Sequence, residues 1–287
     1  MKKSMVNRVR VLRAVPALRR AVLQWRQAGE KIALVPTMGA LHAGHIALAR
    51  AAKRRAPRVI VSIFVNPAQF TPGEDLASYP RSMRSDLATL DRLAVDLAWA
   101  PSTQAMYPAG FATRVVPAGP AMAGLEDKFR PHFFAGVATV VAKLLLQCAP
   151  DFAMFGEKDY QQLKMVRRMA RDLDLPTRIV AVPTVREKDG LALSSRNAYL
   201  SEREREVAPT LYRVLKECAE RIANGESLAR VLDEGAQAIE RVGFMLDYLE
   251  AREADTLAPI GSRNESRIRL LAAARLGRTR LIDNVAV

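Results

Sequence analysis

The sequence predicts an α/β protein with a Rossmann-like, doubly wound parallel sheet and a smaller C-terminal α+β domain. Over the first two-thirds of the 287 residues, apolar runs alternate with segments of helical spacing. That alternation is the pattern of parallel strands joined by helices. In the last third, two amphipathic segments precede several strand-like runs, an order typical of a small α+β unit. We therefore expect two domains, residues 1–187 and a lid formed by residues 188–287.

The earliest predicted elements alternate strand, helix, strand, helix and strand. KIALV (31–35) is a short apolar run, and the segment from about 44 to 55 has helical spacing. RVIVSIFV (58–65) is continuously apolar and rich in β-branched residues, as expected for a strand buried on both faces. SMRSDLATLDRLA (82–94) then predicts a helix and VDLAWA (95–100) a short strand.

The remaining elements of the predicted first domain continue this alternation. GVATVVAKLLLQCA (136–149) is interpreted as a buried helix, although its valines are also common in strands. A strand at DFAMFG (151–156), a helix at DYQQLKMVRRMARDL (159–173) and a strand at PTRIVAVPT (176–184) follow.

The C-terminal third changes from alternating to segregated elements. Two amphipathic helices are expected first, at 202–224 and 227–243. Three strands are expected after them, at 244–252, 266–275 and 279–287. The domain boundary is expected near the polar segment VREKDGLALSSRN, which separates the two patterns.

The formal net charge of +14 admits two interpretations. One is a solvated basic surface that includes a site for anionic substrates. The other is nucleic-acid binding. Basic residues are spread along the chain, as in AKRRAPR (52–58) and MVRRMAR (165–171), without a basic tail or a recognisable nucleic-acid module. We favour the first interpretation and expect no nucleic-acid partner.

The sequence also indicates the compartment. No apolar run reaches the length of a membrane span, and arginines interrupt every apolar stretch of the first twenty residues, unlike a secretory signal. Cys148 and Cys218 lie far apart in helical contexts, so we expect buried thiols rather than a disulfide or a metal site. A cytoplasmic protein without a membrane partner is expected.

Four polar clusters follow predicted strands: PTMGALHAGH (36–45), NPAQF (66–70), GEKDYQQ (156–162) and TVREKDGLALSSRN (184–197). Any one of them alone is best explained as an ordinary loop. Ligands of open parallel sheets bind beyond the carboxyl ends of the strands. Since all four clusters occupy that position, we expect them to line one cleft.

The first cluster holds two of the chain's three histidines, His42 and His45, among Gly39 and Gly44. The start of a helix presents unpaired N–H groups and a partial positive charge, to which phosphates bind readily. Glycines allow close approach of the backbone, and imidazoles add hydrogen bonds or act as acids. A metal pair is the alternative, but no further histidine or paired cysteine supports it. We interpret the cluster as a phosphate-handling turn.

GALHAGH resembles the H-x-G-H signature of the nucleotidyltransferase superfamily. Together with VPTMGALHAGH, SIFVNPAQF, FGEKDYQQL, TVREKDGLALSSRN and the terminal TRLIDN, it resembles the pantothenate synthetase (pantoate–β-alanine ligase) family from about residue 32 to residue 287. The resemblance implies ATP-dependent condensation of pantoate with β-alanine through a pantoyl adenylate, which yields pantothenate, AMP and diphosphate. It also implies Mg²⁺ held mainly by the ATP phosphates, with no protein ligands named, and a homodimer.

The resemblance implies roles for individual residues. The catalytic residues are His45 as proton donor to the leaving diphosphate, His42 and Lys158. Pantoate is bound by Gln69 and Gln162. The residues implied for ATP binding are Met38, Gly39, Ala40, Leu41, His42, Ala43, Gly44, His45, Gly156, Glu157, Lys158, Asp159, Val185, Leu193, Ser194, Ser195 and Arg196.

Two points stay open. KFRPHFFAGV departs from a common family form, because Phe133 stands where a histidine is usual and His132 lies one residue earlier. The alternatives to the ligase are a related nucleotidyltransferase that acts on another small acid or phosphate ester, and a basic nucleic-acid-binding protein.

Overall fold

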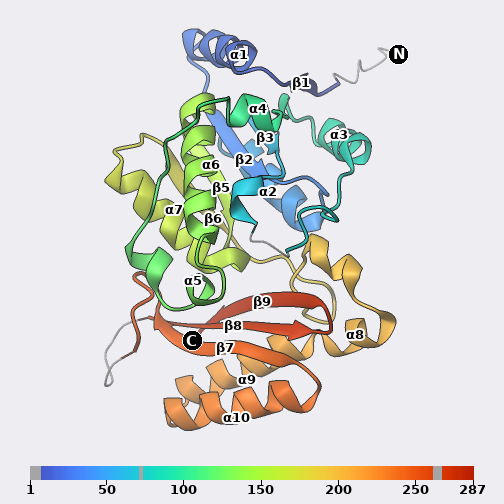
Figure 1. The fold of residues 1–287 in the computed structure, drawn as a ribbon, viewed down its shortest axis with the longest axis vertical. Coiled ribbons are helices and arrows are strands. Elements are labelled where there is room, and N and C mark those ends of the chain that lie inside the picture. The colour runs from blue at the N-terminus through green and yellow to red at the C-terminus, as the bar shows by residue number, and fades with distance from the viewer. Residues whose placement is uncertain (1–7, 71–73, 261–266) are drawn as a thin grey trace. The chain divides into compact units, whose positions relative to one another are not determined.

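The computed structural model describes residues 8–70, 74–260 and 267–287 (Figure 1). They form two compact units, each made of several chain segments. The first comprises Met1–Pro117, Arg130–Gly156 and Met165–Val182, and the second comprises Ala118–Phe129, Glu157–Lys164 and Pro183–Val287. The last segment begins near the predicted boundary at 187/188, but two earlier segments also belong to the second unit. The lid role stays a prediction.

In the described part of the first unit, six strands form one sheet in the order β1-β4-β3-β2-β5-β6. Every neighbouring pair is parallel. The predicted doubly wound parallel sheet is therefore confirmed. The strands are β1 (Arg10–Leu12), β2 (Ile32–Thr37), β3 (Arg58–Ile63), β4 (Leu97–Trp99), β5 (Phe152–Gly156) and β6 (Arg178–Val182).

Helices cover both faces of this sheet. On one face, Ala49 and Ala52 of α2 pack with Val35, Val61 and neighbouring strand residues in one hydrophobic cluster. Because side chains alternate along a strand, the residues between them face the other side, where α6 contacts β2 and α1 (Figure 1). The helices are α1 (Val15–Gln27), α2 (Ala43–Lys53), α3 (Met83–Arg92), α4 (Thr103–Met106), α6 (Phe133–Cys148) and α7 (Tyr160–Asp172), whose first turn belongs to the second unit.

Strand β1 and helix α1 were not predicted from the sequence. Leu18, Ala21 and Val22 of α1 are buried, and their i, i+3, i+4 spacing is that of an amphipathic helix. Pro16 lies in the first turn, where its missing N–H costs nothing. The basic segment from Arg10 onward is thus an edge strand and a helix of the first unit. Residues 1–7 lie outside the described ranges.

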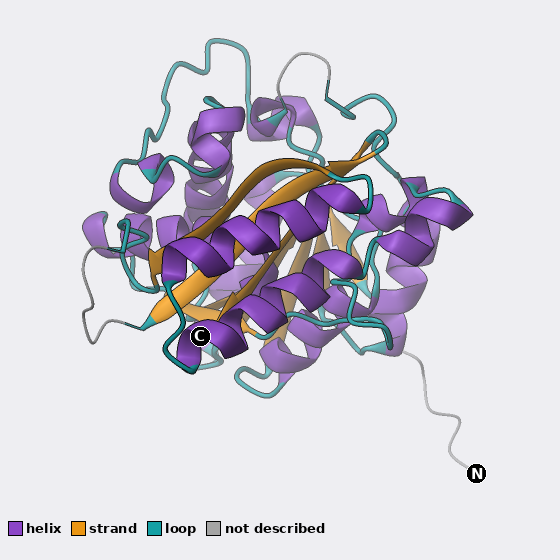
Figure 2. Ribbon diagram, turned by 90° about the horizontal axis from the view of Figure 1, so that it is seen from below, coloured by secondary structure: helices purple, strands orange, loops and turns teal. Residues whose placement is uncertain are grey.

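The second unit packs helices on an antiparallel sheet of β7 (Met245–Glu253), β8 (Ile268–Leu276) and β9 (Thr279–Ala286). Helices α9 (Thr210–Ala223) and α10 (Leu228–Arg241) cover one face of that sheet (Figure 2). Val214, Val231 and Leu270 are among the residues of their shared core. The short helices α5 (Glu126–Phe129) and α8 (Glu202–Val207) complete it. The small α+β domain is confirmed as a fold.

One predicted helix of the second unit is wrong in its continuity. The segment 202–224 is not a single helix, because α8 ends at Val207 and α9 begins at Thr210. Pro209 stands between them, and because proline has no N–H it cannot donate to the carbonyl four residues earlier, which interrupts the helical hydrogen bonds.

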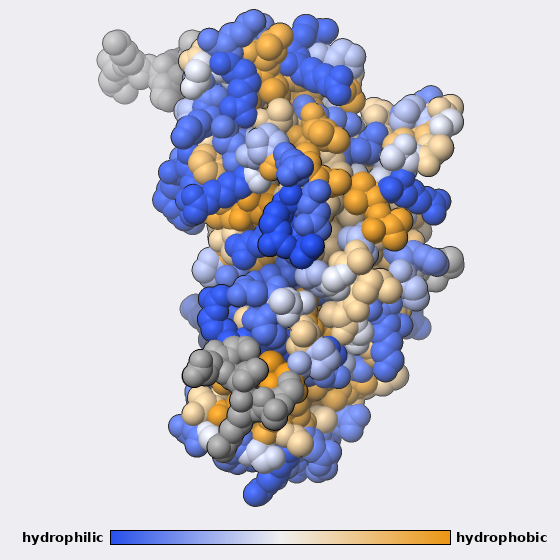
Figure 3. Space-filling view, turned by 90° about the vertical axis from the view of Figure 1, so that its left-hand side faces the viewer, coloured by the Kyte–Doolittle hydropathy of each residue, from blue (hydrophilic) through white to orange (hydrophobic). Residues whose placement is uncertain are grey.

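The helices, thiols and surface bear on the remaining sequence predictions. Within the described ranges, none of the helices combines the length and apolarity needed to cross a bilayer. Cys148 and Cys218 are free and buried, as predicted, and burial raises the pKa of both thiols. On the face drawn in Figure 3, hydrophilic side chains cover much of the surface and hydrophobic ones form smaller patches between them.

Candidate functional site

The loop that follows β2 lies at the point where the strand order reverses. From β2 the chain continues to β3 and β4 on one side, and it later adds β5 and β6 on the other. The pairing of β2 with β5 covers only Ala33 and Leu34, although β2 continues to Thr37. In open α/β sheets, ligands bind at such a switch point, beyond the carboxyl ends of the strands. The loop from Met38 to His42 has this position.

His42 begins α2. It is the N-cap residue, and its Nδ1 accepts a hydrogen bond from the backbone N–H of Gly44 at 3.1 Å. A Cβ at residue 44 would lie 2.9 Å from Cε1 and 3.0 Å from Nδ1 of His42. Gly44 is therefore needed for the imidazole to cap the helix. This contact explains the glycine between the two histidines.

His45 completes a reciprocal capping box. Its Nδ1 accepts from the backbone N–H of His42 at 3.3 Å, and the two ring centroids are 4.1 Å apart. Because each Nδ1 accepts a hydrogen bond, each neutral ring carries its proton on Nε2. The N-terminus of α2 therefore combines helix N–H groups with two Nε2–H donors, which suits an anionic ligand.

The turn between β2 and α2 has an unusual backbone. Gly39 has φ +90° and Ala40 has φ +51°, and the left-handed region is unfavourable for alanine. The carboxylate of Asp86 on α3 accepts from the N–H of Ala40 at 3.0 Å and of Leu41 at 2.9 Å. The hydroxyl of Thr37 accepts from Gly39 N–H at 3.1 Å. Sequence reasoning missed Asp86, because nothing in the helical pattern of α3 marks it as buried.

Gln69 lies on the short 3-10 helix η1 (Pro67–Gln69), after β3. Its Nε2 is 3.0 Å from Sδ of Met38, so the structure brings two predicted site residues together. Asn66 donates to Oε1 of Gln69 at 3.1 Å and to the carbonyl of Gly136 at 3.2 Å. Asn66 is almost completely buried, and the sequence analysis missed its role in orienting Gln69.

Two further side chains hold this turn. Tyr107 donates its hydroxyl proton to Oδ1 of Asn66 at 2.8 Å, and burial raises its pKa to about 12. Arg130 donates to the carbonyl of Gln69 at 3.2 Å and pairs with Glu74 at 2.6 Å. Glu74 is therefore held by a guanidinium. Together these contacts fix the backbone and the amide of Gln69.

In the second unit, the segment after β5 is held by β9. Nδ2 of Asn284 donates to the carbonyls of Glu157 at 3.0 Å and Lys158 at 2.9 Å. Nζ of Lys158 lies 3.7 Å from Oδ1 of Asp159, and the Lys158 side chain is 20% exposed. Asn284 belongs to the terminal TRLIDN motif, so the structure gives that motif a role in fixing the lysine's backbone.

The other predicted residues of the second unit form a second local cluster. The N–H of Leu193 donates to the carbonyl of Val185 at 3.0 Å. Ser194 then begins a 3-10 helix (Ser195–Tyr199), and its hydroxyl accepts from the N–H of Arg196 at 3.2 Å. The clustering of Val185 with 193–196 agrees with a shared role. That role stays a prediction, as do those of the half-buried Gln162 on α7 and of Gly156 at the end of β5.

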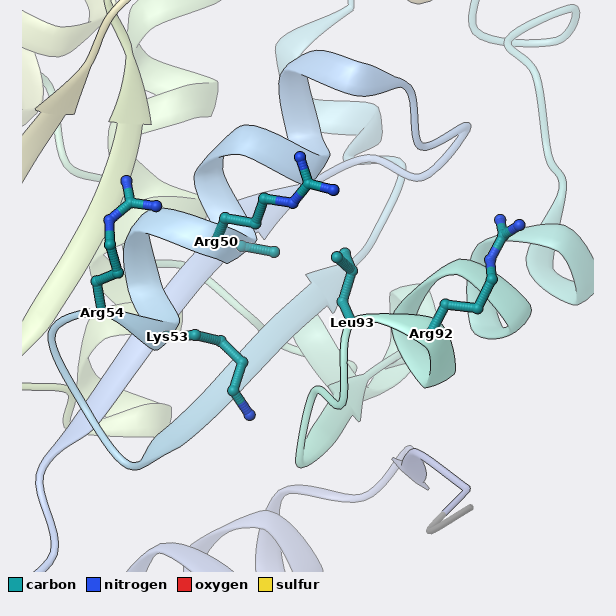
Figure 4. A pocket seen from close by; sticks show the side chains of 6 residues that line it. Arg50, Lys53, Arg54, Arg92 and Leu93 are labelled. Carbon is teal, nitrogen blue, oxygen red and sulfur yellow. The ribbon is translucent and has the colours of Figure 1, made fainter. Parts of the chain in front are cut away.

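A basic pocket lies on the first unit, away from the histidines. It has a volume of about 420 Å³ and is lined by Ala49, Arg50, Lys53, Arg54, Arg92 and Leu93. In Figure 4, Arg50 extends from α2 and Arg92 from α3, on either side of Leu93. His45 and Arg54 are separated along α2 by about 13 Å, so the pocket is at the opposite end of that helix.

The composition of this pocket bears on the high net charge. Its cations stand in the last turns of α2 and α3 or just beyond them, where the helix dipole favours positive charge. Lys53 also lies 3.9 Å from Asp96. None of the pocket's lining residues is aromatic, so it offers no base-stacking surface. The expectation that the protein has no nucleic-acid partner stays a prediction.

No group of three or more His, Cys, Asp or Glu side chains suited to a metal ion occurs in the part of the chain that the structure describes. The predicted phosphate-handling groups are instead backbone N–H groups, imidazoles and a lysine. These are ligands for anions.

Comparison with known proteins shows which family has this sequence and fold. The family model of pantoate-beta-alanine ligase matches residues 10–286. Pantothenate synthetase 2 of Bradyrhizobium diazoefficiens is 61% identical over 277 residues, which are 96% of this chain and 98% of that protein.

Solved structures agree with this match. Pantothenate synthetase from Thermus thermophilus is 49% identical, with a TM-score of 0.91 over 96% of this chain and 99% of that one. A pantoate-beta-alanine ligase from Francisella tularensis, complexed with beta-gamma ATP and beta-alanine, is 34% identical, with a TM-score of 0.81 over 97% of each chain.

The match extends over both units and includes β1 and α1, which the motifs alone did not cover. The resemblance inferred from the motifs is confirmed at the level of the family. The chain belongs to the pantoate-beta-alanine ligase family.

Proposed function

We propose that the protein condenses (R)-pantoate with β-alanine to give pantothenate, AMP and diphosphate through a pantoyl adenylate. The observation that carries the proposal is the family match over residues 10–286, combined with two Nε2–H donors at the start of α2. The structure complexed with beta-gamma ATP and beta-alanine supports ATP and β-alanine as ligands.

The first step forms a phosphorus–oxygen bond. A carboxylate oxygen of pantoate attacks the α-phosphorus of ATP, and the bond from that phosphorus to the β-phosphate oxygen breaks, which releases diphosphate. In the second step, the amine of β-alanine attacks the acyl carbon, AMP departs with the bridging oxygen, and the nitrogen loses a proton. No oxidant or reductant is needed.

His45 and His42 serve the first step as hydrogen-bond donors. Negative charge builds on the leaving diphosphate, and a fixed donor aimed at developing charge contributes about 3 kcal/mol. Nδ1 of His45 already accepts from a backbone N–H. The neutral ring therefore has a single proton on Nε2, and its full transfer would leave an unfavourable anion. We infer that His45 stabilises the leaving group mainly through this hydrogen bond.

The other predicted residues divide by charge. Lys158 and Arg196 supply positive charge for phosphate oxygens, and Ser194 and Ser195 supply hydroxyl donors. The carboxylate of Asp159 suits the paired hydroxyls of ribose.

Two amides serve the acid substrate. Gln69 and Gln162 hold pantoate, whose hydroxyls suit amide groups. Gln69 is the better supported of the two, because Asn66 and Arg130 fix its side chain and its carbonyl.

We propose that Mg²⁺ accompanies ATP. The donor set at the loop, made of N–H groups and imidazoles, does not match the oxygen ligands that Mg²⁺ prefers. Mg²⁺ would thus be held by the phosphates, whose charge it screens. We also propose a cytoplasmic homodimer. The two buried thiols agree with a reducing compartment, and light scattering of the purified protein tests the dimer.

Isotope exchange tests the function. Labelled diphosphate should exchange into ATP when pantoate is present and β-alanine is absent, and β-alanine should then release AMP and pantothenate in equal amounts. Exchange that ignores pantoate but responds to a phosphorylated acceptor would assign the protein to a related nucleotidyltransferase. Formation of ADP and phosphate would exclude an adenylate.

Variants of His45 test its role. His45→Ala should lower the rate of diphosphate exchange by about 10²–10³-fold, whereas His45→Gln, which keeps an N–H donor, should lose less. His132→Ala provides a matched control, because His132 is exposed at the start of α6 and makes no side-chain capping bond there. Full exchange activity in folded His45→Ala protein would remove the residue from the mechanism.

A further inference from the structure

Asp86 is a buried carboxylate outside every set of residues predicted for the site. It lies in the first turn of α3 and is 2% exposed. Its two oxygens accept from Ala40 N–H and Leu41 N–H at 3.0 and 2.9 Å, and the hydroxyl of Ser82 donates to it at 3.1 Å. Each carboxylate oxygen thus engages a different amide of the same turn.

The surroundings of this group supply hydrogen-bond donors to both of its oxygens. The N-terminus of a helix stabilises a negative charge, and a buried carboxylate needs hydrogen-bond donors. Asp86 meets both conditions, because it lies in the first turn of α3 and accepts hydrogen bonds from two backbone N–H groups and one hydroxyl. The carboxylate is therefore a fixed acceptor aimed at the backbone between β2 and α2.

The segment that Asp86 holds has an unfavourable backbone conformation. Gly39 and Ala40 both have positive φ, and such a backbone persists only when its surroundings impose it. A Cβ at residue 39 would lie 3.1 Å from Oδ2 of Asp86. The glycine thus lets the turn approach the carboxylate. Without these bonds the turn would be free to relax, and the start of α2 would shift. Because His42 is the N-cap residue of α2, its imidazole would then be displaced.

We propose that Asp86 is a positioning residue for the nucleotide loop: it holds residues 39–41 in the conformation that presents the loop amides and the two histidines to the phosphates. The predicted effect on the reaction rate rests on the proposed function. The predicted effect on the ordering of residues 39–41 does not depend on that function.

The matched control is on the same helix. Asp91 also accepts a backbone hydrogen bond with its carboxylate, from Val9 N–H. That bond fixes the segment before β1 rather than the loop. Asp86→Ala and Asp91→Ala therefore remove the same kind of interaction from α3, and they differ in the segment that is released.

Three variants, Asp86→Ala, Asp86→Asn and Asp91→Ala, should be compared with the unmodified chain. Asp86→Ala should lower pantoate-dependent diphosphate exchange by about 10²-fold, the effect of misplacing reacting groups by about 1 Å. Asp86→Asn keeps the volume and one acceptor oxygen, so it should recover part of the loss. Asp91→Ala should keep its exchange rate within about twofold, whatever its melting temperature.

Hydrogen exchange provides a readout that does not depend on the reaction. In the ligand-free protein, the amides of Ala40 and Leu41 should lose protection in Asp86→Ala and keep it in Asp91→Ala. If the unmodified chain shows no pantoate-dependent exchange, the proposed function fails, and the amide protection still decides the ordering of the loop. Unchanged protection, or kinetics of folded Asp86→Ala and Asp86→Asn that match those of Asp91→Ala, would overturn the proposal.

Discussion

Gly136 on α6 is the residue whose replacement most directly tests how Gln69 is positioned. A Cβ at residue 136 would lie 2.0 Å from the carbonyl oxygen of Ala68 and 2.8 Å from Cα of Gln69. Both contacts are with backbone, so no side chain can rotate away. Gly136→Ala therefore must displace the η1 turn or α6.

The size of that displacement follows from the contacts. Real Cβ atoms essentially never approach another heavy atom within 3.0 Å, so residue 136 and the Ala68 oxygen have to separate by at least about 1 Å. A shift of about 1 Å in a positioning group costs about 10²-fold in rate. Overpacking also destabilises a core by about 1–3 kcal/mol, partly offset by the better helix propensity of alanine, about 1 kcal/mol.

The assay is steady-state kinetics with pantoate as the varied substrate, combined with urea unfolding. Gly136→Ala should lower kcat/KM for pantoate by about 10²-fold at temperatures where the protein is folded. Gly235→Ala is the control: its Cβ would lie 2.7 Å from Sγ of Cys218, in the helical layer of the second unit. It should destabilise the protein without changing kcat/KM for pantoate.

Two results would refute the reasoning. Unchanged kcat/KM for pantoate in folded Gly136→Ala protein would show that Gln69 is not held by this contact or does not serve the substrate. An equal loss of kcat/KM in Gly235→Ala would show that the effect follows from general destabilisation.

Three further predictions concern charge. Burial raises the pKa of Tyr107 to about 12, so the contribution of its neutral hydroxyl to stability is complete below pH 10. That contribution is lost as pH rises from 10 to 12, by up to about 2 kcal/mol. Urea unfolding should show this loss in the unmodified chain and not in Tyr107→Phe. Lys158→Met should lower diphosphate exchange by about 10²–10³-fold and leave the melting temperature nearly unchanged; an equal loss of stability would give the lysine a structural role. Asp283→Ala should lower the free energy of unfolding in urea by about 3–5 kcal/mol, because it removes the carboxylate that Arg186 contacts at 2.6 and 2.8 Å. Glu226→Ala, which removes one carboxylate of an exposed ion pair, should lower it far less. Equal losses in the two variants would contradict this prediction.

The sequence was sufficient for the elements whose periodicity is local. Strands such as β3 and the helix of residues 43–53 were predicted nearly at their observed ends, because apolar runs and glycines mark them directly. Helix α1 carries the same kind of signal in Leu18, Ala21 and Val22, but arginines interrupt its apolar positions and weaken that signal. The break at Pro209 was also readable, since proline marks a helix boundary.

The contacts that order the site were not readable in this way. Asp86 looks like one acidic residue of an amphipathic helix, and only the tertiary fold brings its carboxylate to Ala40, 46 positions earlier. Gly136 looks like a weak point in an apolar helix until the backbone of Ala68 is placed against it. Motifs name residues that meet ligands, whereas the residues that orient them are set by long-range packing.

The segmented second unit has a consequence for synthesis on the ribosome. Glu126 of α5 is 6% exposed and pairs with Arg280 of β9 at 2.7 Å, 154 positions later. Chains grow at about 5–20 residues per second, so Glu126 waits about 8–30 s for its partner. For most of that interval Glu126 also lacks Tyr248 of β7, whose hydroxyl donates to its carboxylate at 2.9 Å in the folded protein. A nascent chain stalled before β9 would therefore lack the guanidinium that pairs with this carboxylate, well after the parallel sheet of the first unit has all its strands.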